Sequence, residues 1–322
     1  MQRKMTVVGV DLGASNVRFI LYSQGHEKSS LLVPLTARTP HDLEQLVVGG
    51  VRTMLSRGAS CGLTVSAIGV GCAGLVNRER GVLVLPPNMP SIHNVAIGDA
   101  VRSATGLPSF VDNDGNCALL AESVSGVARG KRNVIMFAVG TGIGGALMLN
   151  GRLYTGRNGF AGEVGHIPVM RRGLRCGCGN IGCLETVASG TGIQHYVQRA
   201  AAGGAATAMS PTEMLSAVTI GECAKRGDHL AQRAFSRAAY YLGVAGAGLV
   251  NTLAPDMVVL GGGVSESGLL LAKMDRTLRA KSLALIVEGI SVVLADNGSR
   301  AGAIGAACLA ERLGSGQSLY LD

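Results

Sequence analysis

The sequence predicts an α/β protein with two domains around a cleft, and its length, its composition and an internal repeat support this prediction. The 322 residues exceed what one hydrophobic core usually organises. Apolar residues make up 47% of the chain and charged residues 16%, which gives ample core material for a compact enzyme and is atypical of a disordered chain. The repeat is a strand, a glycine-containing turn and a second strand, and it opens each half of the chain.

The first copy of this repeat lies near the start of the chain. Residues 6–10 are rich in β-branched side chains and predict a strand, residues 11–16 predict a turn, and residues 17–22 predict a second strand.

The second copy begins near residue 133. Residues 133–139 predict a strand, residues 140–145 a glycine-rich turn, and residues 146–149 a strand that ends at an Asn-Gly turn. The two copies superimpose with Gly13 opposite Gly142, which indicates an internal duplication of one supersecondary unit.

Helices are expected between these landmarks, where apolar residues recur at helical spacing or alanines are frequent. The first begins with Pro40 after Thr39, and the long Ala-rich one ends before Pro255. The predicted helices span residues 40–57, 117–128, 229–253 and 301–313, and a strand is predicted over residues 257–260. The tail from Ser315 is polar and is expected to be loosely held.

The charge and the apolar segments exclude several classes of protein. The net charge is +8, but the basic residues are spread out, so a solvated surface that attracts anionic substrates such as nucleotides is favoured over a nucleic-acid interface. Aromatic residues make up only 3%, too few for a base-stacking platform. Neither the N-terminal segment nor residues 242–260 form an uninterrupted apolar stretch, so we expect no signal peptide and no membrane partner. The protein is expected to be cytoplasmic, where thiols stay reduced.

Four residues with metal-binding side chains lie within eighteen positions, in the order His-x9-Cys-x-Cys-x4-Cys. They are His166, Cys176, Cys178 and Cys183. Four such ligands make a closed tetrahedral zinc site, which is structural because it leaves no open position. Buried free thiols, disulfide partners or a redox pair are the alternatives, although Cys-x-Cys is not the usual redox spacing Cys-x-x-Cys. The glycines between the cysteines favour tight turns that let the thiolates converge, and the spacing therefore favours zinc.

Two glycine turns could hold phosphate. Asp11-x-Gly13-x-Ser15 offers a carboxylate toward Mg²⁺, a bare backbone and a hydroxyl. Gly140-x-Gly142-x-x-Gly145 formally matches the dinucleotide fingerprint of Rossmann oxidoreductases, but a hairpin follows it where that fingerprint needs a helix. Either turn alone could be a simple hairpin; the repetition favours a pair of loops that face a nucleotide.

A third polar cluster, residues 111–116, has the sequence Val-Asp-Asn-Asp-Gly-Asn. Its carboxylates and amides suit hydroxyl binding and proton abstraction. The same residues suit a helix N-cap with a turn. The spacing alone leaves both interpretations open.

Together these motifs resemble the ROK family of sugar kinases and related repressors. The family lies within the actin-like ATPase fold, which is ribonuclease H-like and of the hexokinase type. The resemblance covers nearly the whole chain. It rests on the segments at residues 11–15, 113–116, 140–145, 161–166, 176–185 and 260–263.

The resemblance implies a role for each matching residue. Asp114 corresponds to the general base that takes the proton of the sugar 6-hydroxyl. His166 would bind both sugar and zinc. The implied sugar-binding residues are Gly74, Asn88, Asn113, Asp114, Glu163, His166 and Glu185. The implied residues for ATP and its Mg²⁺ are Asp11, Gly13, Ser15, Thr141, Gly142, Gly261 and Gly262.

Two departures from the family pattern stand out. Ser15 replaces the usual threonine and keeps the hydroxyl. The aromatic residue often found after the Pro-Asn-x-Pro element is absent, and this absence affects the wall of the sugar site.

The resemblance also implies an activity and an organisation. We expect ATP-dependent phosphorylation of the 6-hydroxyl of a hexose, glucose or allose, by a homodimer. The alternatives are an N-acetylmannosamine or N-acetylglucosamine kinase and a sugar-sensing regulator. The first phosphate-loop strand starts at Thr6, so no DNA-binding domain is expected before it. The predicted domains are residues 1–115 with 301–322, and residues 116–300, which include a zinc loop at 163–185.

Overall fold

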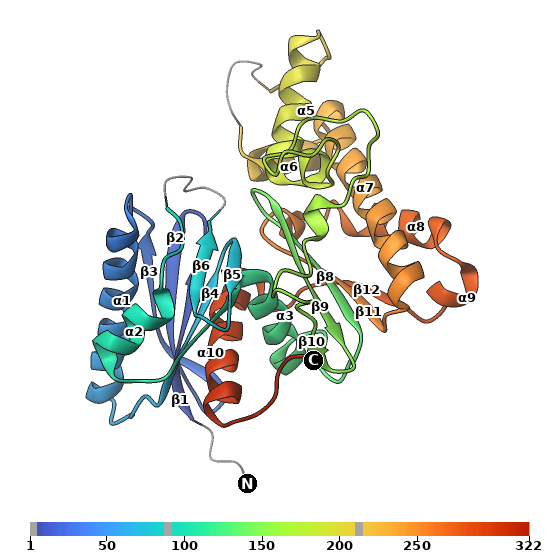
Figure 1. Ribbon diagram of the computed structural model, residues 1–322. Helices are drawn as coiled ribbons and strands as arrows, with labels where there is room; N and C mark the ends of the chain where they lie inside the picture. Colours follow the sequence, from blue (N-terminus) through green and yellow to red (C-terminus); the bar gives the residue numbers. More distant parts are fainter. Residues whose placement is uncertain (1–4, 87–91, 210–214, 322) are drawn as a thin grey trace. The chain divides into compact units, whose positions relative to one another are not determined.

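The computed structural model describes residues 5–86, 92–209 and 215–321 (Figure 1). The chain folds into two compact units. Unit 1 is drawn from Met1–Arg129, Arg152–Ala161 and Ser299–Asp322, and unit 2 from Gly130–Gly151 and Gly162–Gly298. The functional domains predicted above stay a prediction; the compact units differ from them mainly in residues 116–129 and 152–161, which belong to unit 1.

Unit 1 is built on a five-stranded sheet with the order β3-β2-β1-β4-β7. Strands β1, β2 and β3 are antiparallel neighbours, whereas β4 and β7 continue from β1 in parallel. The strands are β1 (Thr6–Leu12), β2 (Asn16–Ser23), β3 (His26–Pro34), β4 (Ala67–Cys72) and β7 (Ser109–Asn113). A small two-stranded sheet, β5 (Leu75–Asn77) with β6 (Val82–Leu85), follows β4.

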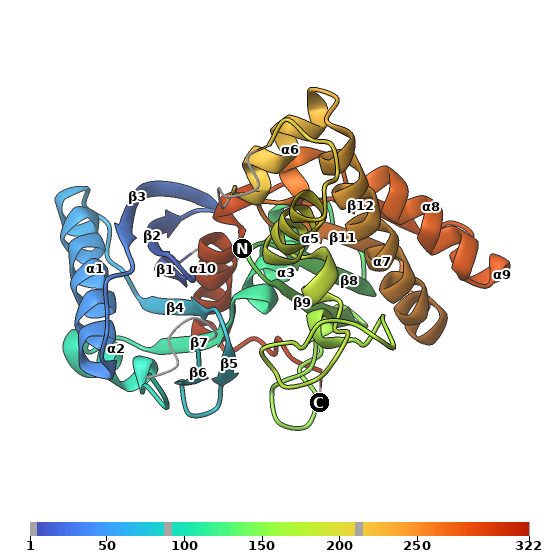
Figure 2. The same ribbon diagram turned by 90° about the horizontal axis from the view of Figure 1, so that it is seen from above.

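Helices cover both faces of this sheet because successive residues of each strand point to opposite sides. Val8 and Val10 join the core under α1 (Pro40–Ser60), whereas Val7 joins the core under α10 (Ala301–Gly314). Figure 2 shows α1 and α2 (Ile97–Thr105) on one side of the sheet and α10 on the other. Helix α10 also packs on α3 (Asp114–Ser125).

Glycine allows the close approach of α10 to the sheet. A Cβ added at Gly69 would collide with the carbonyl oxygen of Ala306, and one added at Gly9 would collide with that of Ala303. Both glycines therefore let the helix backbone rest directly on the strands.

Unit 2 repeats the plan of unit 1. The second sheet has the order β10-β9-β8-β11-β12, with β9 antiparallel to β8 and with β11 and β12 continuing in parallel. Its strands from unit 2 are β8 (Val134–Val139), β9 (Ile143–Leu149), β11 (Met257–Gly261) and β12 (Ser291–Leu294), and its short edge strand β10 (Arg152–Leu153) is counted with unit 1.

The helices of unit 2 cover one face of its sheet with a large apolar core, in which Phe137 and Phe235 are fully buried or nearly so. Helix α7 is central to this layer and packs along α8 and α6. The helices are α4 (Glu185–Ala188), α5 (Gly190–Ala202), α6 (Ala217–Lys225), α7 (His229–Leu253), α8 (Leu271–Lys281) and α9 (Ala284–Val287). Single 3₁₀ turns occur at Val164–His166, Ser265–Ser267 and Gly298–Arg300.

The strand registers refine the predicted duplication. The β1–β2 ladder ends at the pair Leu12–Val17, and the β8–β9 ladder ends at Val139–Ile143. Counted from these pairs, Gly13 corresponds to Gly140, so the expected superposition of Gly13 on Gly142 is wrong. The loop of unit 2, residues 140–142, is shorter than that of unit 1, residues 13–16.

Most predicted elements are present, and some of their bounds need correction. Strand β9 begins at Ile143 and not at residue 146, so the predicted turn over residues 140–145 is shorter than expected. Helix α3 begins at Asp114 and not at residue 117, because the Asn113 side chain caps it, and it ends at Ser125 and not at residue 128. The tail is exposed at residues 314–318, but it is not loosely held as a whole. Leu319 is buried and pairs by backbone hydrogen bonds with Leu153, so the segment returns to unit 1.

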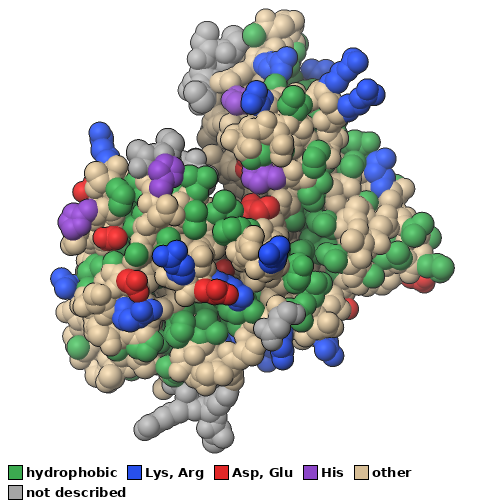
Figure 3. Space-filling model, in the orientation of Figure 1, with side chains coloured by type: hydrophobic (Ala, Val, Ile, Leu, Met, Phe, Trp, Pro, Cys, Tyr) green, Lys and Arg blue, Asp and Glu red, His purple; other side chains and the backbone are tan. Residues whose placement is uncertain are grey.

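Two surface properties complete the description. No helix among the described residues is long and apolar enough to cross a membrane. On the face drawn in Figure 3, Lys and Arg side chains are scattered among other residue types and form no single patch.

Candidate active site

The first group of candidate residues lies where the parallel strands of unit 1 end. Parallel pairing places Asp11 of β1 beside Gly71 of β4, and Gly71 beside Asp112 of β7. Residues in register on neighbouring parallel strands point to the same face, so both carboxylates lie on the side of α3 and α10. The Cys117 side chain of α3 covers the gap at Gly71, since its Sγ would lie 3.0 Å from an added Cβ.

Asp11 is held in a confined position at the start of α10. Its carboxyl group lies so close to Gly302 that a Cβ there would come within 2.5–2.8 Å of it. Burial raises the pKa of Asp11 to about 6, and the charge of Arg18 opposes this rise only in part. A carboxylate in this state suits cation binding, because a bound cation would favour its charged form.

The predicted proton acceptor, Asp114, is the first residue of α3. Asn113 accepts hydrogen bonds at its Oδ1 from the backbone N–H groups of Gly115 (2.8 Å) and Asn116 (3.4 Å). Its Nδ2 donates to the carbonyl oxygen of Gly74 at 3.0 Å. Asn113 is thus the helix cap that one interpretation of the cluster predicts, and it also links this cap to the segment after β4.

Asp112, beside these residues, is 2% exposed and was not among the predicted site residues. Its Oδ1 accepts from Asn116 Nδ2 (2.9 Å) and from the Asn113 backbone N–H (2.7 Å). Its Oδ2 accepts from the Tyr320 hydroxyl at 2.8 Å. Burial raises the pKa of Asp112, while these donors and the charge of Arg78 act to lower it.

The second group of candidate residues surrounds the shorter loop of unit 2. The start of α5 holds this loop: the N–H groups of Gly190 and Thr191 donate to the carbonyl oxygens of Gly140 (2.8 Å) and Thr141 (3.2 Å). Gly262 has φ +86°, and an added Cβ would collide with the Val139 backbone. The structure therefore brings the predicted nucleotide residues of unit 2 together: Thr141, Gly142, Gly261 and Gly262.

Glu185 links this loop to the cysteine segment. Its Oε2 accepts from the Ile143 N–H at 2.9 Å and lies directly against Gly142, where a Cβ would collide with it. Its Oε1 lies 3.7 Å from Cys176 Sγ. One carboxylate thus contacts both the phosphate-type loop and a predicted metal ligand.

The four predicted metal ligands converge on one point. The ligand atoms of His166, Cys176, Cys178 and Cys183 all lie within 4.8 Å of one another. Cys176 Sγ lies 3.6 Å from His166 Nδ1, and Cys178 Sγ lies 3.7 Å from Cys183 Sγ. A tetrahedron with Zn–S bonds of about 2.3 Å has S···S edges of roughly 3.8 Å, so the residues fit a zinc ion.

Backbone geometry and charge support the same conclusion. Gly182 has φ +77°, and an added Cβ would collide with the Met170 carbonyl group, so the turn that delivers Cys183 requires glycine. Burial raises the pKa of Cys176, and raises that of Cys183 to about 12, whereas a backbone hydrogen bond at Asn180 lowers that of Cys178. Adjacent thiols cannot all ionise without a cation, which zinc would supply.

The second ring nitrogen of His166 lies outside the predicted metal cluster. With Nδ1 among the metal-binding atoms, its Nε2 points toward Glu163, whose Oε2 is 3.9 Å away. Burial raises the pKa of Glu163; the His166 charge opposes this rise and the Glu185 charge adds to it. The predicted sugar-binding residues of unit 2 therefore form one cluster: Glu163, His166 and Glu185.

The remaining predicted residues lie as follows. Gly13 and Ser15 are in the β1–β2 loop, where the Gly13 N–H donates to the Asn16 carbonyl at 3.1 Å and Ser15 is exposed. Gly74 follows β4 and has φ +110°. Asn88 lies outside the described residues.

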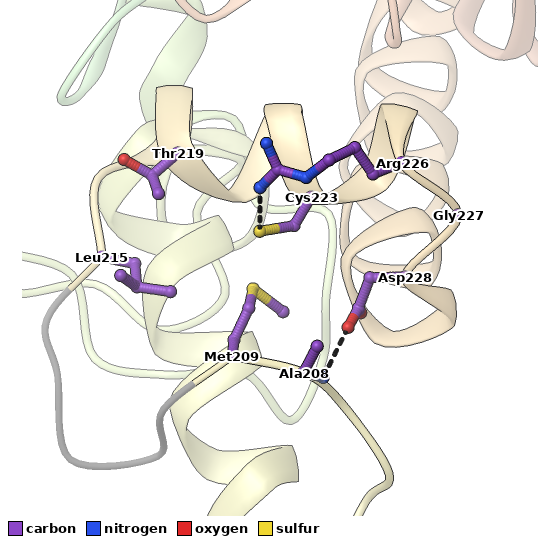
Figure 4. Close-up of a pocket in the computed structure, with 8 residues that line it drawn as sticks. All are labelled: Ala208, Met209, Leu215, Thr219, Cys223, Arg226, Gly227 and Asp228. Atoms are coloured by element: carbon purple, nitrogen blue, oxygen red, sulfur yellow. Dashed lines mark hydrogen bonds between the residues drawn. The ribbon is translucent and has the colours of Figure 1, made fainter.

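An open pocket of about 440 Å³ lies elsewhere in unit 2, and it is lined by residues of the segment between α5 and α6, of α6 itself and of the α6–α7 turn (Figure 4). Arg226 donates to Cys223 Sγ at 3.3 Å, and the Ala208 N–H donates to Asp228 Oδ2 at 3.0 Å. None of the predicted site residues lines this pocket, so it is separate from the chemistry described above.

The duplicated sheet order and the loop after the first strand of each sheet define an actin-like ATPase fold. A solved structure of a ROK family glucokinase from Streptomyces griseus, in complex with glucose and AMPPNP, has this fold. It matches with a TM-score of 0.80 and 32% identity over 95% of this chain and 99% of that chain.

The chain belongs to the ROK family, whose model matches residues 7–313. A glucokinase of Thermotoga maritima is 33% identical over 97% of this chain and 99% of its own length. The DNA-binding transcriptional dual regulator NagC of Escherichia coli is 29% identical over 96% of this chain and 76% of its own length. The family therefore includes both catalytic and regulatory relatives of this chain.

Proposed function

We propose that this protein is an ATP-dependent sugar kinase that transfers the γ-phosphate of ATP to the 6-hydroxyl of a hexose. The observation that carries the proposal is the placement of Asp114. Its carboxylate stands at the first residue of α3, beside the capping residue Asn113, which binds Gly74. The likeness to two glucokinases, one of them solved with glucose and AMPPNP, supports the same activity.

Asp114 acts as the catalytic base in this proposal. It takes the proton of the sugar 6-hydroxyl as the oxygen attacks the γ-phosphorus, and ADP leaves on the opposite side. Asn113 and Gly74 bind the sugar next to that hydroxyl. Because the phosphoryl group needs little covalent help, most of the rate enhancement comes from positioning and charge.

ATP is held by bare backbone and by polar side chains. Gly13, Ser15, Thr141 and Gly142 contact phosphate oxygens, and Gly261 with Gly262 binds the adenosine part. Asp11 would hold Mg²⁺, whose charge would offset that of the phosphates. The collisions that a Cβ at Gly142 or Gly262 would cause support this role, since neither site can carry a side chain without moving a neighbour.

The metal cluster has a structural role in this proposal. His166, Cys176, Cys178 and Cys183 would hold zinc, which would fix the loop. Glu163, Glu185 and the Nε2 of His166 then bind the other sugar hydroxyls, together with Asn88. Dependence of sugar affinity on the metal follows, although the metal takes no part in phosphoryl transfer.

A panel of sugars tests the activity and identifies the substrate. ADP release would be measured with glucose, allose, mannose, N-acetylglucosamine and N-acetylmannosamine, and phosphorus NMR would locate the phosphate on the product. We expect the highest turnover with glucose or allose and none with the 6-deoxy sugar. No turnover with any hexose or N-acetylhexosamine would refute the proposal, and so would full activity of Asp114→Ala.

A sugar-responsive regulator is the second candidate, because NagC matches nearly the whole of this chain. Calorimetry separates the two functions. A regulator would bind sugar without ATP turnover, whereas a kinase would turn over ATP only when the sugar is present.

Three further proposals rest on the family. The protein acts as a homodimer, which light scattering after size exclusion would test. It acts in the cytoplasm, which fractionation of the source cells would test. Its functional domains are residues 1–115 with 301–322 and residues 116–300, and hydrogen exchange would show whether α3 opens with the first or the second.

A further inference from the structure

The segment Leu319–Leu321 is fixed to unit 1 by a short parallel bridge. The Leu153 N–H donates to the Leu319 carbonyl at 3.0 Å, and the Leu321 N–H donates to the Leu153 carbonyl at 2.9 Å. Leu319 is 2% exposed, whereas the residues just before it are exposed. The bridge therefore places Tyr320 at a defined position after a solvent-facing stretch.

Tyr320 reaches Asp112, the buried residue that immediately precedes Asn113 and Asp114. Its hydroxyl donates to Asp112 Oδ2 at 2.8 Å, while Oδ1 takes both other donors, Asn116 and the Asn113 N–H. Among the described residues, Tyr320 is the hydrogen-bond donor to Asp112 Oδ2. Burial and the neighbouring Asp112 hold the pKa of Tyr320 well above its ordinary value, so the hydroxyl remains a donor.

The ring of Tyr320 also contacts the turn between β5 and β6. The Arg78 guanidinium lies over it, 3.7 Å from the ring centre. Arg78 follows strand β5, which begins directly after Gly74, and Gly74 accepts from Asn113. Tyr320 thus lies between the β5–β6 hairpin and the β7–α3 junction and contacts both.

We propose that Tyr320 is a positioning residue for phosphoryl transfer: by fixing Asp112 and Arg78 it sets how the β7–α3 junction presents Asn113 and Asp114 to the sugar. This inference rests on the proposed function of Asp114. It assigns a catalytic purpose to a tail that composition alone describes as a loose polar end. The argument is geometric, since a small misplacement of a reacting group can cost about 100-fold in rate.

Tyr320→Phe is the direct test, because it removes the hydroxyl and keeps the ring over which Arg78 stacks. With ATP and the best sugar of the panel, we expect kcat to fall roughly 30-fold and the KM for ATP to change less than twofold. Tyr22→Phe is the matched control. It is a buried tyrosine of unit 1, and its hydroxyl donates to the Gly25 carbonyl at 2.9 Å, not to Asp112.

The pH profile separates positioning from a general loss of stability. Without the hydroxyl, the charged form of Asp112 loses a donor, so its pKa rises further and the acidic limb of kcat moves to higher pH. The charged or titratable groups around Asp112 are Asp11 on β1, Cys72 on β4, Arg78 after β5, Asp114 and Cys117 on α3, and Tyr320. A purely structural role would leave this limb where it is.

Two further measurements keep the test decisive. Arg78→Met frees the ring but keeps the hydroxyl, and should lower kcat roughly 3- to 10-fold. Amide exchange of residues 112–120 should become faster in Tyr320→Phe and stay unchanged in Tyr22→Phe, which requires no turnover. If Tyr320→Phe keeps kcat within twofold, or if neither exchange nor the acidic limb changes, the inference is overturned. Absence of turnover in the unaltered protein would instead overturn the proposed function.

Discussion

The two units share one sheet plan but differ where their parallel strands end. In unit 1 the row across β1, β4 and β7 reads Asp11, Gly71 and Asp112. In unit 2, β8 and β11 place Ala138 beside Gly261, and Ala295 follows β12 next to the Leu260–Leu294 pair. A central glycine is thus flanked by two carboxylates in one unit and by two alanines in the other.

Under the proposed function, this difference divides the tasks of a duplicated scaffold between its two units. In the proposed reaction, Asp11 of unit 1 binds the cation, and Asp112 orders the neighbouring residues Asn113 and Asp114. The alanines of unit 2 carry no polar side chain, and Glu185 and the four predicted metal ligands are supplied there by the segment after β9. Phosphoryl transfer needs both carboxylates that hold a cation and backbone N–H groups that contact phosphate.

The largest effect is expected from the two strand-to-helix junctions. Asp114 lies two positions after Asp112. Asn297 lies two positions after Ala295, the residue that corresponds to Asp112 in unit 2. Asp114→Asn should lower kcat about 1000-fold, as expected for loss of a general base, whereas Asn297→Ala should stay within threefold. Steady-state kinetics would check both. Equal losses in the two variants would show that the units do not differ in the way we infer.

Next comes the predicted metal cluster, which lies in unit 2 and has no counterpart among the described residues of unit 1. Cys178→Ser should remove most of the zinc found by elemental analysis and lower kcat/KM for sugar about 10- to 100-fold. The exposed Cys61 of unit 1 provides the control, since Cys61→Ser should leave metal content and activity unchanged. Intact activity in Cys178→Ser with less than about half an equivalent of zinc would contradict a structural metal.

A smaller effect distinguishes the two loops. Gly142→Ala must displace the Glu185 carboxylate, so we expect kcat/KM for ATP to fall roughly 10- to 30-fold. Gly13→Ala should cost less, because its Cβ would meet only the Asn16 carbonyl at 3.2 Å. Gly144→Ala, with open space at its Cβ, is the control within unit 2. A greater loss in Gly13→Ala than in Gly142→Ala would reverse the comparison.

The smallest effect is on stability. Asp11 has an ordinary pKa of 3.8, and burial raises it to about 6 in the folded protein. The folded state therefore binds the proton more tightly, and the free energy of unfolding falls as pH rises from 3.8 to 6. Asp11→Asn should flatten this slope and stabilise the protein at pH 7.5 by about 1–2 kcal/mol, after allowance for partial exposure. Thermal unfolding at pH 4.5 and pH 7.5 measures this difference; an Asp11→Asn variant less stable at pH 7.5 would contradict it.

Local patterns in the sequence were sufficient for much of the fold. Helix α7 has the bounds that its Ala-rich stretch and Pro255 predict, and both hairpins form where β-branched residues flank glycines. The convergence of the four predicted metal ligands also followed from their spacing, because a closed set of soft ligands within one short segment can converge without help from the rest of the chain.

Tertiary structure alone decided the supporting contacts. Tyr320 lies 208 positions from Asp112 in the sequence, and their hydrogen bond depends on the bridge between Leu319–Leu321 and Leu153. Glu185 likewise meets Gly142 only after the chain has folded back. Such pairs have no local period or spacing, since the sheet register and the helix packing determine them. The sequence by itself determined which chemical groups this protein has, and only the tertiary structure determined which of them hold one another in place.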